Sequence, residues 1–325
     1  MKLPLAPLLL LAATLGSSSG KRLTPLDWWQ TEVIYQIYPR SFKDINGDGV
    51  GDLKGIISKL GYLKGLGVNV IWLSPIFKSP MVDFGYDISD FRDIEPIFGT
   101  ITDFKNLLAD MKKLGMKMIL DFVPNHTSDQ HVWFQKSVAK VPNYADYFVW
   151  KDAKRINGVR HPPNNWLSCF GGSAWTWNEQ RQQYYFHAFA PQQPDLNFRN
   201  PNVIGELESI LRYWLDHGVD GFRFDSVPFL VEHGSFPDEP PSGNTDFEPM
   251  DHDYLSHNYT MDQPETYEII YRIRKLLDSY KLMDGRTRIF ITECYSLSVS
   301  GLMKYYGNNT VRGAHFPSTS SPLPI

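Results

Sequence analysis

Cysteine is scarce in this chain of 325 residues, in which only Cys169 and Cys294 occur. Two cysteines cannot build a disulfide framework, so the stability of the fold must come from a hydrophobic core. An excess of positive charge is also missing. The formal net charge is −4 and the sequence pI is near 6.1. This balance argues against nucleic acid or an anionic membrane surface as the main partner.

Long apolar runs are absent after the N-terminus, so we expect no transmembrane segment in this chain. At the N-terminus, Lys2 precedes an apolar run from Leu3 to Leu15, and small residues follow. This pattern is typical of a secretory signal peptide, which we assign to residues 1–20; a signal anchor is the alternative. We therefore expect a secreted, extracellular protein. Sequons that suit a glycoprotein begin at Asn125, Asn258 and Asn308.

Apolar β-rich runs alternate along the chain with segments of helical spacing. The predicted strands are 32–39, 68–73, 116–123, 218–227 and 288–293, and the predicted helices are 53–66, 104–114, 203–215 and 269–277. Three of these helices end at a glycine that a strand follows at once: Gly67, Gly115 and Gly218. Such alternation predicts an α/β fold with a parallel sheet covered by helices.

The connections after the helices are short, whereas those after the strands are long and carry acidic residues. This asymmetry favours an incomplete TIM-type (β/α)8 barrel, with about five of eight strands and a site at the C-terminal strand ends. A doubly wound open sheet is the alternative, although no Gly-x-Gly-x-x-Gly follows the first strand. We expect barrel segments at 27–123 and 202–317, an inserted subdomain at 124–201 after strand 3, and a divergent tail at 318–325.

Acidic residues lie at or just past the ends of three successive predicted strands: Asp121, Asp225 and Glu293. Glycoside hydrolysis requires a pair of carboxyl groups, one ionised and one protonated. Arg223 lies two residues before Asp225 and points to the same side of the strand, where it favours an ionised carboxylate. A structural salt bridge between Arg223 and Asp225 is the alternative reading.

His126 and His187 are candidates to donate hydrogen bonds to sugar hydroxyl groups. Neither belongs to a His-Glu-x-x-His or clustered Cys/His pattern, so we do not expect them to bind a metal. Aromatic residues make up 14% of the chain, which suits a flat apolar ligand such as a sugar ring, although most of these rings must lie in the core.

A second motif runs from Asp44 to Asp52. Oxygen-bearing side chains stand at its positions 1, 3, 5 and 9 with glycine at position 6, which matches the front of a Ca²⁺ loop. The predicted ligands are Asp44, Asn46, Asp48, the backbone carbonyl of Val50, and Asp52. Position 12 is Gly55 rather than glutamate, so a turn of Gly and Asp without a metal is the alternative.

Several segments resemble conserved regions of the α-amylase superfamily. Asp121–His126, Gly221–Asp225 and Ile291–Glu293 resemble its first three regions. Gln193–Asn197 resembles an extra region of the α-glucosidase and oligo-1,6-glucosidase branch, and 28–42 is similar to that branch too. Together with the secretion signal, this makes the chain similar to maltases of the insect digestive type over about residues 27–317.

The resemblance implies that Asp225 is the nucleophile, and that Glu293 protonates the leaving oxygen and then activates water. It implies that Tyr86 stacks on the terminal glucose, while Asp87, His126 and Arg223 hold its hydroxyl groups or the nucleophile. It also implies a structural Ca²⁺ in the loop described above. Anomeric configuration would be retained, with the two carboxyl groups roughly 5–5.5 Å apart.

The sequence departs from the family in one respect that affects activity. The family carries a third essential acid in an Asn-His-Asp motif, which is absent from these 325 residues. The chain therefore resembles a truncated secreted α-glucosidase that acts on maltose, sucrose or short oligosaccharides, and we expect its own activity to be very low. An endo-acting α-amylase and a non-catalytic binding or receptor relative are the alternatives.

Overall fold

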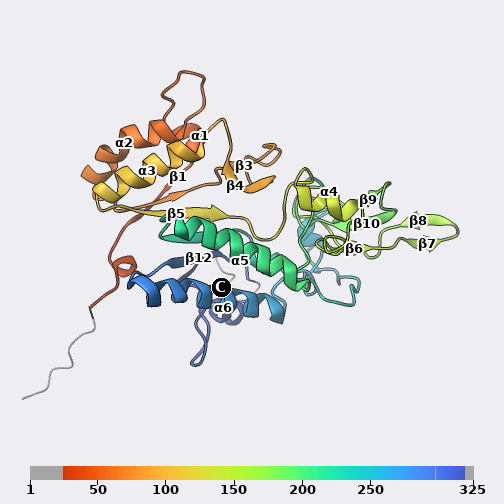
Figure 1. The fold of residues 1–325 in the computed structure, drawn as a ribbon. Coiled ribbons are helices and arrows are strands. Elements are labelled where there is room, and N and C mark those ends of the chain that lie inside the picture. Colours follow the sequence, from red (N-terminus) through yellow and green to blue (C-terminus); the bar gives the residue numbers. More distant parts are fainter. Residues whose placement is uncertain (1–24, 297, 319–325) are drawn as a thin grey trace, which may run out of the picture.

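Six strands form one parallel sheet in this computed structural model, which describes residues 25–296 and 298–318 (Figure 1). Their order is β1-β2-β5-β11-β12-β13, and all five pairings are parallel. The strands are β1 (Ile34–Ile37), β2 (Val70–Leu73), β5 (Lys117–Phe122), β11 (Gly221–Phe224), β12 (Ile289–Glu293) and β13 (Phe316–Ser318). The predicted signal peptide and all but the first residue of the predicted tail lie outside the described residues.

Five helices connect successive strands of this sheet: α2 (Leu53–Gly65), α3 (Ile101–Lys113), α5 (Pro201–Asp216), α6 (Pro264–Asp284) and α7 (Val299–Tyr305). Their N-termini carry local signals. In α3, Thr100 and Asp103 form a reciprocal capping box, and in α5 the Asn200 side chain accepts a hydrogen bond from the Asn202 backbone. The predicted alternation of strands and helices is therefore confirmed.

The two faces of the sheet pack differently because strand side chains alternate. Residues such as Ile71, Leu120 and Phe222 pack with the helices in the main core. The intervening residues form a separate small cluster on the other face, composed of Val70, Ile119, Ile289 and Ile291. A curled parallel sheet covered by helices on its outer side is half of a barrel, which agrees with the predicted fold class.

The sheet has one strand more than we predicted. Phe316–Ser318 pairs in parallel with β12 and forms the sixth strand. Three residues with a central proline do not show the alternation of a strand, and proline is tolerated here because β13 is an edge strand.

A segment with little regular structure lies between β5 and α5. It contains α4 (Val132–Val138), a three-stranded antiparallel sheet of β6 (Trp150–Lys151), β9 (Trp175–Asn178) and β10 (Gln183–Phe186), and a hairpin of β7 (Lys154–Ile156) and β8 (Val159–His161). A smaller pair, β3 (Phe77–Lys78) and β4 (Asp90–Ile94), follows β2. Short helical turns complete the described chain: η1 (Trp28–Gln30), α1 (Pro39–Phe42), η2 (Val227–Phe229) and η3 (His252–Tyr254).

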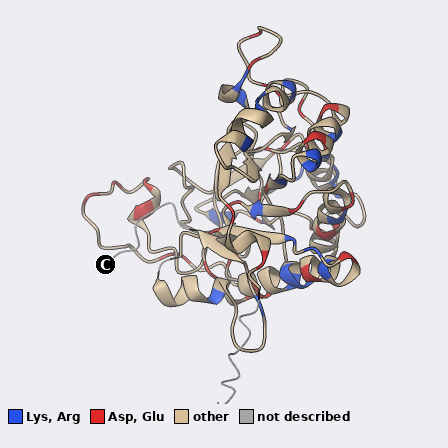
Figure 2. Cartoon of the chain, turned by 90° about the vertical axis from the view of Figure 1, so that its left-hand side faces the viewer, with Lys and Arg blue, Asp and Glu red and all other residues tan. Residues whose placement is uncertain are grey.

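Acidic and basic residues are interspersed along the outer helices (Figure 2). Some of them pair between helices, as where Arg272 of α6 lies 2.6 Å from Glu208 of α5. Among the residues that the structure describes, no helix is both long and apolar enough to cross a membrane.

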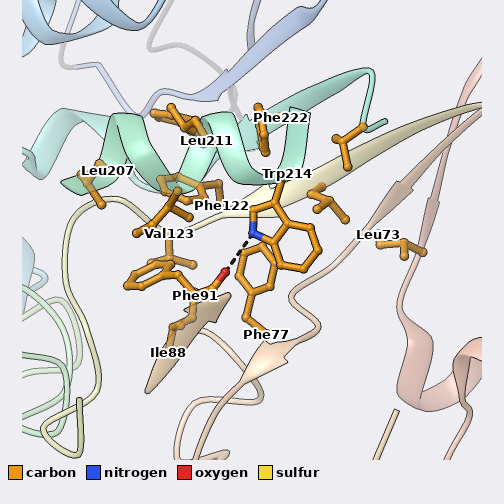
Figure 3. Close-up of a cluster of buried hydrophobic side chains, with 14 of the residues drawn as sticks. Leu73, Phe77, Ile88, Phe91, Phe122, Val123, Leu207, Leu211, Trp214 and Phe222 are labelled. Atoms are coloured by element: carbon orange, nitrogen blue, oxygen red, sulfur yellow. Dashed lines mark hydrogen bonds between the residues drawn. The ribbon is translucent and has the colours of Figure 1, made fainter. Parts of the chain in front are cut away.

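Trp214 of α5 joins the helix layer to the segment that follows β2 (Figure 3). Its ring stacks on Phe77 at 5.0 Å and meets Phe104 edge-on at 5.2 Å, and its indole N–H donates to the Phe91 carbonyl at 2.8 Å. The side chain is fully buried. Trp214 therefore contributes both apolar packing and one buried hydrogen bond.

We expect Trp214→Ala to lower the free energy of unfolding by about 3–5 kcal/mol, because it opens a large cavity. Trp214→Phe keeps an aromatic ring but leaves the Phe91 carbonyl without its donor, which costs about 1–3 kcal/mol. Urea unfolding measures both values. The control is Tyr62→Ala at an exposed position of α2, with an expected change within about 0.5 kcal/mol. Equal losses in Trp214→Ala and Tyr62→Ala would contradict this assignment.

Candidate active site

Three neighbouring strands bring the candidate catalytic residues together. Asp121 of β5 is directly opposite Arg223 of β11, and Arg223 is opposite Ile291 of β12. Asp225 follows the last residue of β11, and Glu293 is the last residue of β12. Because parallel strands end at the same edge of a sheet, these side chains gather at its C-terminal edge.

One guanidinium group bridges all three carboxylates. Arg223 Nη1 lies 2.9 Å from Asp121 Oδ1 and 2.6 Å from Asp225 Oδ1, while Nη2 lies 2.6 Å from Glu293 Oε1. The salt bridge that was the alternative reading for Arg223 and Asp225 thus exists, as part of a larger cluster. Asp121, Arg223 and Asp225 are buried and Glu293 is half-buried, so solvent screens these interactions only weakly.

Charge repulsion and burial both favour retention of a proton in this cluster. Burial raises the pKa of Asp121 to about 6 and the pKa of Asp225 well above its usual range, and in both residues Arg223 opposes the rise. Three carboxylates around one guanidinium leave an excess of negative charge when all are ionised. One ionised and one protonated carboxyl group is the combination that glycoside hydrolysis uses.

Two further groups hold the cluster, and sequence reasoning missed both. The indole N–H of Trp72 donates to Asp121 Oδ2 at 3.1 Å, and the backbone N–H of Ser226 donates to Glu293 Oε2 at 3.2 Å. Ser226 adopts a left-handed conformation with φ of 47°. Strand alternation alone indicates that Trp72 shares a face with Val70, but the Ser226 contact depends on how the chain turns after β11.

Tyr86 and His126 lie beside the carboxylate cluster. Burial raises the pKa of the Tyr86 hydroxyl, and the nearby charges of Asp121 and Asp225 raise it further. His126 Nε2 lies 3.2 Å from the Tyr86 carbonyl and 3.0 Å from the amide nitrogen of Gln193. Gln193 comes from the segment before α5, and its contact with His126 connects this segment to the barrel edge.

Asp87 and His187 are already engaged by protein groups. The buried Asp87 carboxylate accepts hydrogen bonds from the Ser79 hydroxyl and from the Val82 and Asp83 backbone, at 2.9–3.0 Å. His187 contacts the Thr176 hydroxyl at 3.0 Å and the Phe189 carbonyl at 2.8 Å, and burial lowers its pKa to about 4. Either residue would have to exchange a protein partner to bind a sugar hydroxyl.

The Asp44–Asp52 loop holds its side-chain oxygens with its own backbone. Asp44 accepts hydrogen bonds from Gly47 and Gly49 at 2.7 and 2.9 Å, and Asp48 accepts one from Val50 at 2.8 Å. Asn46 also contacts Asp48, and Asp52 caps α2 through the Gly55 backbone at 2.7 Å. The carboxylate, amide and carbonyl oxygens are the ligand types that Ca²⁺ prefers.

The carboxylates of this loop do not converge as closely as those of a preformed site. In the described ranges, one group of three His, Cys, Asp or Glu side chains has all its ligand atoms within 4.8 Å, and it lies elsewhere, at His252, Asp253 and His257. A shared ion would therefore have to draw Asp44, Asp48 and Asp52 together. The loop fits Ca²⁺ in ligand chemistry and would need to close around it.

Comparison with known proteins places this geometry in a family. Residues 36–318 match the family model described as "Alpha amylase, catalytic domain". Maltase A2 of Drosophila melanogaster is 52% identical over 97% of this chain and 56% of its own length. The salivary alpha-glucosidase of Aedes aegypti is 52% identical over 90% of this chain and 51% of its own. A human relative, the amino acid transporter heavy chain SLC3A1, is 46% identical over 95% of this chain and 45% of its own.

Among solved structures, the alpha-glucosyl transfer enzyme XgtA matches with a TM-score of 0.82 and 45% identity, over 90% of this chain and 54% of its own. The chain thus spans about half the length of the relatives it matches. The matched region includes the whole carboxylate cluster, from Asp121 to Glu293. With a family model over most of its length and relatives near 50% identity, this chain belongs to the α-amylase family.

Proposed function

We propose that this protein is a secreted α-glucosidase that removes terminal α-linked glucose from maltose, sucrose or short oligosaccharides, with retention of configuration. The observation that carries the proposal is the bridging of Asp225 and Glu293 by the single guanidinium of Arg223. Two carboxyl groups on one guanidinium lie close together, as retaining enzymes require, whereas inverting enzymes place them about 6.5–9.5 Å apart.

In this mechanism Asp225 attacks the anomeric carbon and forms a glucosyl ester, while Glu293 donates its proton to the leaving oxygen. Glu293 then accepts a proton from the water that hydrolyses the ester. Arg223 positions both groups and stabilises the ionised form of Asp225. Tyr86 and His126, at the rim of the cluster, would contact the terminal glucose.

The relatives support this substrate class and the export of the protein. Their names include a maltase and a salivary α-glucosidase, and one solved structure of the family holds the substrate sucrose. The N-terminal apolar run supports secretion independently of these relatives.

The test measures the anomeric form of the product. Because the chain spans about half of its relatives, residues 36–318 are exchanged into Maltase A2 of Drosophila melanogaster, which supplies the remaining sequence. We expect the chimera to hydrolyse maltose and to release α-glucose first, as followed by proton NMR. Initial release of β-glucose would contradict retention, and an inactive but folded chimera would contradict the proposed activity.

Starch distinguishes the endo-acting alternative. An α-glucosidase releases glucose from the non-reducing end, whereas an endo-acting α-amylase releases oligosaccharides. The non-catalytic alternative gains weight from the transporter heavy chain among the relatives. The presence of both Asp225 and Glu293 at the strand ends favours catalysis over that alternative.

We also propose that the Asp44–Asp52 loop binds a structural Ca²⁺. Isothermal titration of the full chain with CaCl₂ is expected to show one site, and Asp48→Ala is expected to weaken it by at least about tenfold, since ligand charge sets affinity in such loops. Asp246→Ala, at an exposed loop position, is the matched control. Absence of binding by the unmodified chain would leave the loop as a turn without a metal.

A further inference from the structure

We propose that His252, Asp253 and His257 form a binding site for a transition-metal ion such as Zn²⁺. The three residues lie in and just after η3, in the long segment between β11 and α6. All three ligand atoms lie within 4.8 Å of one another, and His252 Nδ1 is 2.9 Å from Asp253 Oδ1. The residues of this site are separate from the carboxylate cluster and from the Asp44–Asp52 loop.

The hydrogen bonds of His257 leave the ring nitrogen that a metal needs. His257 Nε2 lies 2.7 Å from the His252 carbonyl oxygen, which can only accept, so Nε2 carries the proton. Nδ1 then holds the lone pair and accepts from the Thr260 hydroxyl at 3.2 Å. A metal-binding histidine commonly donates its other ring N–H to a backbone carbonyl in this way, which fixes its orientation.

Packing holds the ligands near one another before any ion binds. The His252 and His257 rings stack with their centroids 3.6 Å apart and their planes at 9°. The buried carboxylate of Glu239 accepts backbone hydrogen bonds from residues 258–260 at 2.6–3.0 Å, which anchors the chain just after His257. A site whose ligands are already positioned has a smaller entropic cost of closing around an ion.

The protonation states also suit a metal ligand. Burial lowers the pKa of His257 to about 4, and burial lowers the pKa of His252 as well, although the Asp253 carboxylate opposes that change. Both imidazoles are therefore neutral at neutral pH. Neutral imidazole and ionised carboxylate are the forms that coordinate a metal.

The ligand set selects the class of ion. Two imidazole nitrogens and one carboxylate oxygen suit Zn²⁺, Cu²⁺ or Ni²⁺, whereas Ca²⁺ prefers oxygen ligands alone. The metal would take the place of the proton between His252 Nδ1 and Asp253 Oδ1, and that proton is released to solvent. Because parallel stacked rings cannot point at one ion, the His252 ring must tilt; its side chain is 18% exposed and has room to do so.

Titration of the full chain with ZnCl₂ alone tests the site. We expect one Zn²⁺ per chain. His252→Phe keeps a ring that stacks on His257 but removes a ligand, and it should weaken binding by at least about 100-fold, since even outer partners of metal ligands contribute about 10–100-fold. Asp253→Asn keeps the shape of the side chain and should cost about tenfold or more.

Two controls separate this site from other zinc-binding groups. His161→Phe changes an exposed histidine of β8, and Asp246→Asn changes an exposed loop acid; neither should alter the affinity. Circular dichroism shows that each variant is folded. The proposal is overturned if the unmodified chain binds no Zn²⁺, if His252→Phe binds as tightly as the unmodified chain, or if His161→Phe abolishes binding.

Discussion

In the Maltase A2 chimera, Asp225→Asn is expected to lower kcat/KM for maltose on the order of 10⁴-fold or more, comparable with the loss of other activated nucleophiles. The amide has nearly the size of the carboxylate, so packing is preserved. It cannot form the glucosyl ester, however, because its nitrogen and oxygen are poor nucleophiles beside an ionised carboxylate. Steady-state hydrolysis of maltose measures the effect.

Asp246→Asn makes the same chemical change at an exposed loop position and should leave kcat/KM unchanged. Glu293→Gln adds a second comparison. It should lower hydrolysis of maltose by about 10²–10⁴-fold. An aryl glucoside with a good leaving group needs no proton donor in the first step, so that step should be much less affected. Near-normal activity of Asp225→Asn would rule out this residue as the nucleophile.

Arg223→Leu is expected to lower the free energy of unfolding of the chain by about 3–5 kcal/mol at pH 7, because it leaves three carboxylates without their shared cation. Asp121 and Asp225 lie in a buried setting that already raises their pKa values. Without the guanidinium, both pKa values rise further. Urea unfolding at several pH values measures the loss.

The direction of the pH dependence follows from these shifts. An acid whose pKa is raised in the folded state contributes stability that is fully present below its unfolded pKa of about 3.9, and this stability is lost as pH rises through the folded pKa. Asp121, with a folded pKa of about 6, already behaves in this way. The deficit of Arg223→Leu should therefore be smallest near pH 4–5 and should grow towards pH 7.

Arg223→Lys keeps one positive charge but cannot reach three carboxylates with a fork of donors, so an intermediate loss is expected. Arg160→Leu, on the exposed hairpin strand β8, should change stability within about 0.5 kcal/mol. A deficit of Arg223→Leu that is independent of pH would show that packing, rather than the three carboxylates, explains the loss.

The elements of the half-barrel could be predicted from local patterns. The five predicted strands and four predicted helices all appear, because an apolar run or a 3.6-residue period is a property of neighbouring residues. Glycine marks such as Gly115 and Gly218 adopt positive φ after their helices, as the C-terminal stop requires. The strand of Phe316–Ser318 escaped prediction because only its pairing with β12 makes it a strand.

The sequence by itself determined which residues stand at the strand ends, since Asp121, Asp225 and Glu293 each follow an apolar run. Only the tertiary structure decided that one guanidinium bridges all three, because residues about 100 positions apart meet through the register of β5, β11 and β12. The contact of Ser226 with Glu293 and the stacking of His252 on His257 arise in the same way. Local periodicity specifies elements, whereas distances between side chains depend on how those elements pack.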